Sequence, residues 1–321
     1  MPYTDGPEAQ QLTPPSPDSP PPEQAENVDP FEAKKERAWQ LALEGKLRPS
    51  LELLDELLAW ARKHGDRPQL DRALCARASV LVELGETSGI KQDLRRVLLG
   101  NDDAEVSFLA AYTLSRAYDI ETDVEKAVFY ARIANRHALA GGSVEQQSSS
   151  FNQLGNLMLA QSDFEEAFEY LKKSLALIGP GPSIRRGICL DNLGYCYTIW
   201  GRYGKAFGAL FEALRILRKN GARALEANTL LSLAFAYLQM GRFDRALRHG
   251  RKSLVMAEEC EDHMVVKYCL FVLGEAEKLS GNPLAAREHF LRLEKQFYPE
   301  NPNVSDLLLV LNVQNLINLK A

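Results

Sequence analysis

The sequence predicts an all-α fold, a solenoid of about seven helix-turn-helix repeats with a capping helix at its C-terminal end. Two observations predict it. One is a turn residue that recurs in steps of 37 to 40 residues, at Gly45, Gly85, Thr122, Ser162, Gly201, Gly241 and Gly281. The other is the helical spacing of apolar residues on both sides of these turns. A fixed period of this size is typical of solenoids, in which each unit buries its apolar face only against its neighbours.

The unit around Gly201 illustrates why both halves of a repeat should be helical. Its first half carries a stripe at i, i+3, i+4 and i+7, formed by Leu190, Leu193, Gly194 and Tyr197. Its second half carries another stripe, formed by Tyr203, Ala206, Leu210, Ala213 and Leu214. This second helix is expected to end at Asn220-Gly221, a typical C-terminal cap. The small residues of both stripes would let the helix backbones approach closely.

Three segments are expected along the chain. Residues 1–29 form an acidic, Pro-rich tail, since residues 1–30 hold nine of the sixteen prolines, six acids and no Lys or Arg. Such a segment cannot bury enough apolar surface to offset its ordering entropy, so it should be disordered. Residues 30–303 form the repeat domain. Residues 304–321 should contain one more helix, Asp306 to Leu319, which caps the last repeat; its broad apolar content leaves a homodimer through this helix open.

Several classes of function find no support in the sequence. No run of about 18 apolar residues is present, and the first residues lack the basic and apolar regions of a secretory signal, so a cytoplasmic protein is expected. The five cysteines form no CxxC pair and read as buried reduced thiols. No metal-ligand spacing, phosphate loop or nucleophile with a base occurs at a recognisable spacing. We therefore expect no enzyme, no metal and no cofactor.

The formal charge of −5 conceals a basic stretch. Residues 182–257 hold thirteen Lys or Arg against four acids, a net +9, which leaves −14 for the rest of the chain. Sign asymmetry of this kind bears on partners rather than on fold. Part of the stretch forms a basic stripe on second helices, comprising Arg202, Lys205, Arg242, Arg245, Arg248, Arg251 and Lys252. Its partner would be an acidic protein surface, a nucleic acid or the chain's own acidic tail, of which nucleic acid is the least favoured.

The pattern resembles the tetratricopeptide repeat. The family signature W-x2-L-G-x2-Y, followed by an alanine and an aromatic, appears here as Leu190, Leu193, Gly194, Tyr197, Ala206 and Leu210. Weaker or equivalent copies recur from Phe151, Leu230 and Leu270, and the similarity covers roughly residues 31–298. The period of about 40 is longer than the common 34, as in the long-helix relatives of this family. The resemblance implies a right-handed superhelix that binds peptides or proteins.

In this family the first helix of each repeat lines a concave groove. Carried over by register, the resemblance implies peptide-binding residues at Tyr112, Arg116, Asn152, Asn156, Asp191, Asn192, Tyr195, Asn228, Phe235, Glu275 and Lys278. An asparagine amide both donates and accepts, which suits it to hold the backbone of an extended peptide. Tyr195 and Phe235 would supply stacking area.

The sequence therefore predicts a scaffold or adaptor that holds a protein or peptide partner in its concave groove. One alternative is an adaptor for an acidic or polyanionic partner, which would use the basic convex stripe of repeats five and six. Another is a ligand-sensing regulator whose effector domain is a separate chain, and a short peptide that changes the superhelix pitch on binding would favour it. The sequence does not name the partner.

Overall fold

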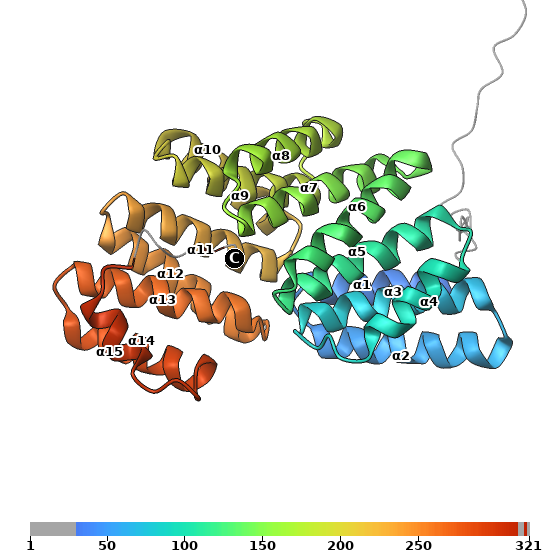
Figure 1. The fold of residues 1–321 in the computed structure, drawn as a ribbon, viewed down its shortest axis with the longest axis horizontal. Coiled ribbons are helices and arrows are strands. Elements are labelled where there is room, and N and C mark those ends of the chain that lie inside the picture. The colour runs from blue at the N-terminus through green and yellow to red at the C-terminus, as the bar shows by residue number, and fades with distance from the viewer. Residues whose placement is uncertain (1–29, 314–317, 320–321) are drawn as a thin grey trace, which may run out of the picture.

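The computed structural model describes residues 30–313, 318 and 319, so the predicted acidic tail, residues 1–29, lies outside the described residues. This part of the chain contains fifteen α-helices and no strand. Fourteen of them form seven antiparallel pairs, α1 (Pro30–Leu43) with α2 (Leu47–His64), α3 (Arg67–Glu83) with α4 (Ile90–Gly100), α5 (Ala104–Ile120) with α6 (Val124–Gly141), α7 (Val144–Ala160) with α8 (Phe164–Ile178), α9 (Ile184–Ile199) with α10 (Tyr203–Lys219), α11 (Arg223–Gln239) with α12 (Phe243–Glu259), and α13 (His263–Leu279) with α14 (Pro283–Phe297). The last helix, α15 (Val304–Val310), packs on α14 (Figure 1). The predicted all-α solenoid of seven repeats is confirmed.

The turn inside each repeat has the same backbone conformation. All seven predicted turn residues adopt a positive φ, which lies between 60° and 89° and includes the non-glycine residues Thr122 and Ser162. A left-handed residue of this kind ends the first helix and lets its last carbonyls accept hydrogen bonds from the turn. The spacing of the turns in the sequence therefore located every repeat correctly.

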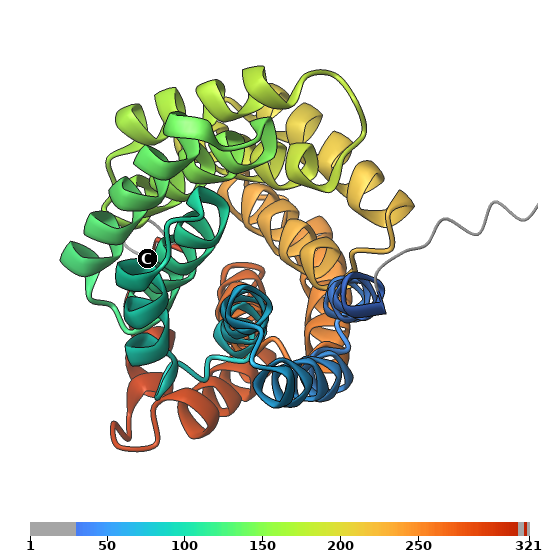
Figure 2. The same cartoon turned by 90° about the vertical axis from the view of Figure 1, so that its right-hand side faces the viewer.

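The first helix of each repeat lies toward the inside of the superhelix and the second lies outside. From α3 to α13, consecutive first helices pack against one another, whereas within the described chain no two second helices make comparable contact. Helices at the smaller radius must lie closer together, so the first helices form the inner face. Seen from the side, the repeats wind round into a ring (Figure 2).

The ring closes where the first repeat meets the sixth. Helix α1 contacts α11, and Arg48 lies 4.0 Å from Glu261 in the turn between α12 and α13. The turn residue Gly45 packs directly on Cys260, so closely that a Cβ at this position would overlap the sulfur. Gly45 is thus required both by its positive φ of 81° and by this contact. The superhelix therefore completes about one turn within its seven repeats.

Small residues at the predicted positions bring the two helices of a repeat together. Ala206 is fully buried, and a Cβ added at Gly194 would lie 2.6 Å from the side chain of Leu210. The tetratricopeptide signature at these positions is thus a packing requirement between α9 and α10. All five cysteines are buried free thiols, as expected, and burial raises the pKa of Cys75 to about 12 and that of Cys189 to about 11.

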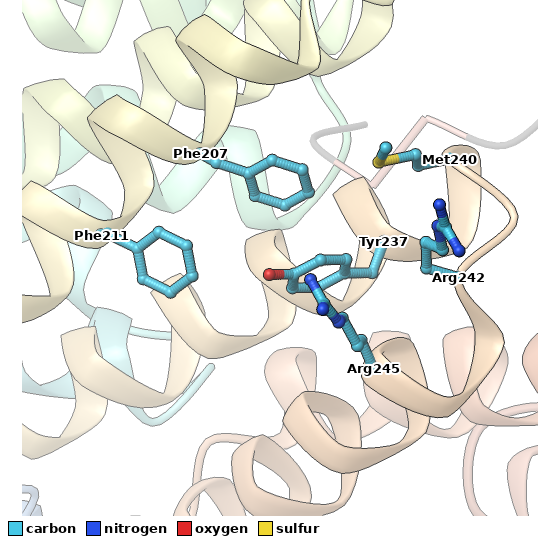
Figure 3. A pocket seen from close by; sticks show the side chains of 6 residues that line it. All are labelled: Phe207, Phe211, Tyr237, Met240, Arg242 and Arg245. Atoms are coloured by element: carbon cyan, nitrogen blue, oxygen red, sulfur yellow. The ribbon is translucent and has the colours of Figure 1, made fainter.

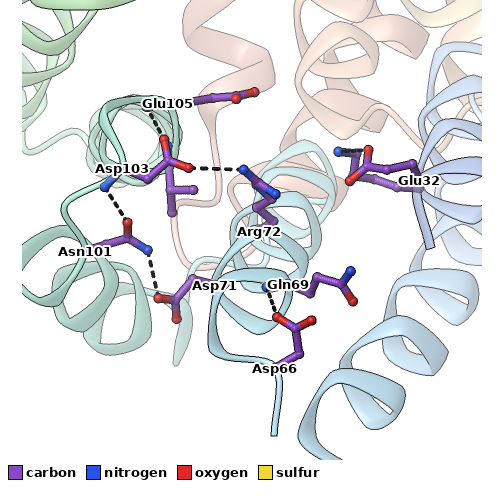
Figure 4. A network of polar contacts seen from close by, with 10 residues as sticks. Glu32, Asp66, Gln69, Asp71, Arg72, Asn101, Asp103 and Glu105 are labelled. Carbon is purple, nitrogen blue, oxygen red and sulfur yellow. Dashed lines mark hydrogen bonds and ion pairs between the residues drawn. The ribbon is translucent and has the colours of Figure 1, made fainter. Parts of the chain in front are cut away.

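The second repeat departs from the others because α4 is only 11 residues long. Polar side chains fix the loop that follows it (Figure 4). The buried carboxylate of Asp71 pairs with Arg67 and accepts a hydrogen bond of 3.0 Å from Asn101. Asp103 caps α5 through the amide of Glu105 and pairs with Arg72 on α3 at 3.1 Å. Ion pairs and side-chain hydrogen bonds thus connect the loop between α4 and α5 to α3.

The C-terminal segment differs from its prediction. The capping helix was expected to run from Asp306 to Leu319, but α15 ends at Val310, and Leu311 is extended with ψ at 142°. Among the residues beyond it that the structure describes, Asn318 and Leu319 contact Tyr195 on α9 instead of continuing over the last repeat. The predicted helix therefore ends at Val310 and does not continue through Leu311.

Candidate functional site

All eleven predicted peptide-binding residues lie on first helices, namely α5, α7, α9, α11 and α13. The structure divides them into groups with different surroundings. Some are half-buried on the inner face, and others are buried in contacts between neighbouring repeats. Among the buried ones, Asp191 on α9 is only 2% exposed.

The asparagines form part of a ladder between repeats. Asn192 donates a hydrogen bond of 3.0 Å to the side-chain oxygen of Asn152, one repeat earlier, and both side chains are buried. Asn156, one turn further along α7, is half-buried, and its side-chain oxygen accepts no hydrogen bond from the described residues. Asn228 on α11 is also half-buried. Asn152 and Asn192 thus join two repeats, while Asn156 and Asn228 remain partly exposed.

The two predicted stacking residues stack on each other. The rings of Tyr195 and Phe235 lie 5.6 Å apart and 20° from parallel, and each side chain is 1% exposed. An open aromatic surface for a ligand was expected here, and that expectation was wrong. Because the two residues occupy the same register in neighbouring repeats, their rings face each other across the contact between α9 and α11.

The hydroxyl of Tyr195 contacts the chain's own C-terminal segment. It donates a hydrogen bond of 2.8 Å to the side-chain oxygen of Asn318 and accepts one of 3.0 Å from the backbone amide of Leu319. Burial raises the pKa of Tyr195, so the phenol stays protonated and can make both bonds. The side-chain amide of Asn318 also donates a hydrogen bond of 2.6 Å to the carbonyl oxygen of Leu159, near the end of α7. Two residues remote in sequence, Asn318 and Leu319, are therefore bound on the inner face.

Glu275 and Lys278 serve the same C-terminal region. Lys278 pairs with the fully buried Glu275 at 2.5 Å and donates hydrogen bonds to the carbonyl oxygens of Leu308 and Leu311. Burial raises the pKa of Glu275, against the effect of Lys278. Lys278 thus satisfies the free carbonyls at the end of α15, which is where the segment toward Asn318 begins.

Tyr112 and Arg116 belong to an ionisable cluster on α3 and α5. Arg116 pairs with Glu83 at 2.8 Å, and both Tyr112 and Arg116 are half-buried. Burial raises the pKa of the neighbouring Asp119 to about 6, although the positive charge of Arg116 opposes the shift. Burial likewise raises the pKa of Asp262, at the start of α13, and the negative charge of Glu83 adds to it. The inner face near the ring closure is therefore rich in desolvated carboxylates, which sequence reasoning missed.

The basic stripe lies on the outer face, as predicted, and all seven of its side chains are exposed. Arg251 pairs with Glu277 at 2.7 Å, and Lys252 lies 4.0 Å from Glu226. The other five have no acidic partner within the described part of the chain, namely Arg202, Lys205, Arg242, Arg245 and Arg248. The charge of the stripe is thus largely unneutralised.

An aromatic pocket opens within this stripe (Figure 3). It encloses about 340 Å³ and is lined by Phe207, Phe211, Tyr237, Met240, Arg242 and Arg245. Phe207 and Tyr237 form its apolar wall with ring centroids 4.4 Å apart, and the guanidinium of Arg245 lies 5.6 Å from the Tyr237 ring. Phe211 and Met240 are each 43% exposed. The signal for this pocket, aromatic residues four apart on a basic second helix, is present in the sequence at Phe207 and Phe211, but sequence reasoning missed it.

The tetratricopeptide repeat family matches residues 146–219 and 225–295. The chain contains tetratricopeptide repeats over these residues. A search of curated proteins returned no match.

Solved structures share the fold of this chain. A Rap protein complexed with Competence and Sporulation Factor aligns with a TM-score of 0.65 and 13% identity, over 83% of this chain and 75% of that one. NprR in complex with its cognate peptide NprX aligns with a TM-score of 0.60 and 13% identity, over 88% of this chain and 81% of that one. A tetratricopeptide repeat protein from Parabacteroides merdae aligns with a TM-score of 0.52 and 16% identity, over 89% of this chain and 99% of that one. No helix in the described residues has the length and apolar content to cross a bilayer.

Proposed function

We propose that this protein binds a peptide segment of a partner on the inner face of its superhelix. The observation that supports the proposal is the contact of Tyr195 with Asn318 and Leu319, in which an inner-face side chain bonds to a side-chain amide and to a backbone amide of residues remote in sequence. The Rap and NprR structures add support, because each shares this fold and was solved with a bound factor or peptide.

The residues free to hold such a partner are the half-buried ones. The side-chain oxygen of Asn156 is buried and accepts nothing from the described chain, so turning this side chain toward the inner face would let it accept from a ligand's backbone amide. Asn228 lies two first helices further along the same face. Tyr112 and Arg116 extend the site toward the ring closure, where the nearby carboxylates of Glu83 and Asp119 favour a ligand that carries positive charge.

The test is a selection of random 12-residue peptides displayed on phage, followed by titration of the selected peptides. The Asn156→Ala, Asn228→Ala double variant should bind them roughly tenfold less tightly, as expected for one or two lost hydrogen bonds. Asn301→Ala, which removes an exposed asparagine in the loop before α15, is the matched control and should bind like wild type. Equal affinity of wild type, the double variant and the control would exclude a binding site at Asn156 and Asn228.

The outer pocket supports a second candidate function, the binding of an acidic segment with an apolar anchor. Unneutralised arginines beside exposed aromatic rings offer both ion pairing and stacking to such a segment. The test is the affinity of a Glu-rich peptide with one Phe for wild type and for Arg242→Ala, Arg245→Ala. The affinity should fall in the variant and at high salt, and an unchanged affinity would exclude this use of the pocket.

A further inference from the structure

The inner face recognises both ends of the Asn318 side-chain amide. Its oxygen accepts from the hydroxyl of Tyr195 at 2.8 Å, and its nitrogen donates to the carbonyl of Leu159 at 2.6 Å. A carboxylate of the same length could not donate to that carbonyl, and an apolar side chain could make neither bond. The arrangement therefore selects asparagine at this position.

The next residue is selected by packing. Leu319 is 6% exposed and belongs to the main hydrophobic core of the repeats, while its backbone amide donates to Tyr195 at 3.0 Å. The hydroxyl of Tyr195 thus bonds to both residues of the pair, and its ring is held in place by Phe235. The site is built for an asparagine followed by a leucine.

The segment reaches this site from a fixed starting point. Lys278 holds the carbonyls of Leu308 and Leu311, and only six residues separate Leu311 from Asn318. A short link of this kind keeps its end at an effective concentration of about 1 mM. If the pair bound with a dissociation constant of about 0.1 mM, an external peptide would bind roughly tenfold more weakly while the internal one is present.

We propose that Asn318 and Leu319 are a built-in occupant of the inner-face site, and that the external ligand is a peptide with an Asn-Leu pair that competes with them. This inference rests on the proposed function, since it names the chemistry of the ligand for that same face. The protein is then a binder that a matching peptide must open by displacing its own C-terminal segment.

The experiment measures binding of a fluorescein-labelled peptide with the sequence of residues 316–321, which contains one Asn-Leu pair, by fluorescence anisotropy. The full-length chain is compared with a quadruple variant that carries Asn315→Ala, Leu316→Ala, Asn318→Ala and Leu319→Ala. The earlier pair is included because it could otherwise slip into the site. The quadruple variant should bind the labelled peptide about tenfold more tightly than wild type.

Two controls assign the gain to the site. Val310→Ala changes a side chain that is 83% exposed at the end of α15 and should leave affinity at the wild-type value. Adding Tyr195→Phe to the quadruple variant keeps the ring but removes the hydroxyl that makes two of the bonds, so affinity should fall about tenfold. Thermal unfolding of each protein checks that the repeats remain folded.

The inference is overturned if the quadruple variant binds no more tightly than wild type, or if Tyr195→Phe leaves its affinity unchanged. If phage-selected peptides bind the inner face through Asn156 and Asn228 while either result holds, the proposed function stands and the internal occupant does not. If neither kind of peptide binds this face, both proposals fall.

Discussion

Repeats three and four begin their second helices differently from repeats five and six. In the former, Asp123 and Asp163 stand at the N-cap and accept hydrogen bonds of 3.2 and 3.0 Å from backbone amides in the first turn. In the latter, the same positions hold Arg202 and Arg242, and neither makes a side-chain cap. The turns themselves are alike, since the residues before these caps all have positive φ.

The residue at this cap position affects both the stability of the helix and the charge of the outer face. An aspartate at the N-cap satisfies a free amide and interacts favourably with the helix dipole, whereas an arginine does neither. Stacking of Arg202 over Trp200, 5.2 Å from the ring, offsets part of the loss. Arg242 lines the outer pocket. The arginines thus stand at some cost to stability on the face that carries the unneutralised charge, as expected where a surface is used for binding.

The largest expected effect tests what the two regions share. Ala167 and Ala206 are fully buried at the same position of repeats four and five. Ala206→Leu and Ala167→Leu should each lower the free energy of unfolding by about 1–3 kcal/mol, because a larger side chain overpacks the helix crossing. Urea unfolding measures both. An unchanged stability in only one variant would mean that the cores of the two repeats are not equivalent.

A smaller effect is expected at an inner-face position where repeat three differs from its neighbours. Asp119 stands where repeats four and six have the buried Leu159 and Leu238. Its pKa is about 6 in the fold and about 4 in an unfolded chain. The folded state therefore binds the proton more tightly, and stability falls as pH rises from about 4 to about 6.

Asp119→Asn removes this dependence. The variant and wild type should have equal stability near pH 4, and above pH 6 the variant should be more stable by about 1–2 kcal/mol, since partial exposure and Arg116 limit the penalty. Melting temperatures measured between pH 4 and pH 8 provide the check. If the stability of wild type instead increases relative to that of the variant as pH rises, Asp119 is not desolvated.

Exchanging the caps tests the comparison directly. Arg242→Asp should raise the free energy of unfolding by about 1 kcal/mol, and Asp163→Arg should lower it by a similar amount. Arg248→Asp, in the middle of the same exposed helix face, is the control for the change in charge. If Arg242→Asp stabilises no more than Arg248→Asp, the cap position has no special cost.

The smallest effects are expected for single charges on the outer face. Lys172 makes an exposed ion pair of 3.1 Å with Glu169, and Arg248 has no acidic partner among the described residues. Lys172→Ala and Arg248→Ala should each change the unfolding free energy by less than about 0.5 kcal/mol. A larger loss in either variant would indicate a contact that the fold does not explain.

Sequence reasoning succeeded where structure depends on near neighbours. The turn residues, the helix pairing and the small residues at Gly194 and Ala206 follow from periodicity, because each repeat packs mainly on the next. It failed where the outcome depends on how adjacent helices are rotated. The repeat register places Tyr195 and Phe235 on first helices, but it does not predict that their rings stack on each other.

The sequence by itself determined the seven repeats, their turns and the basic outer stripe, since all three are local patterns repeated along the chain. Only the tertiary structure decided that the ring closes at Gly45 and Cys260 and that Asn318 reaches Tyr195, 123 residues away. Such contacts depend on small rotations between repeats that accumulate over the whole superhelix, and no local spacing records their sum.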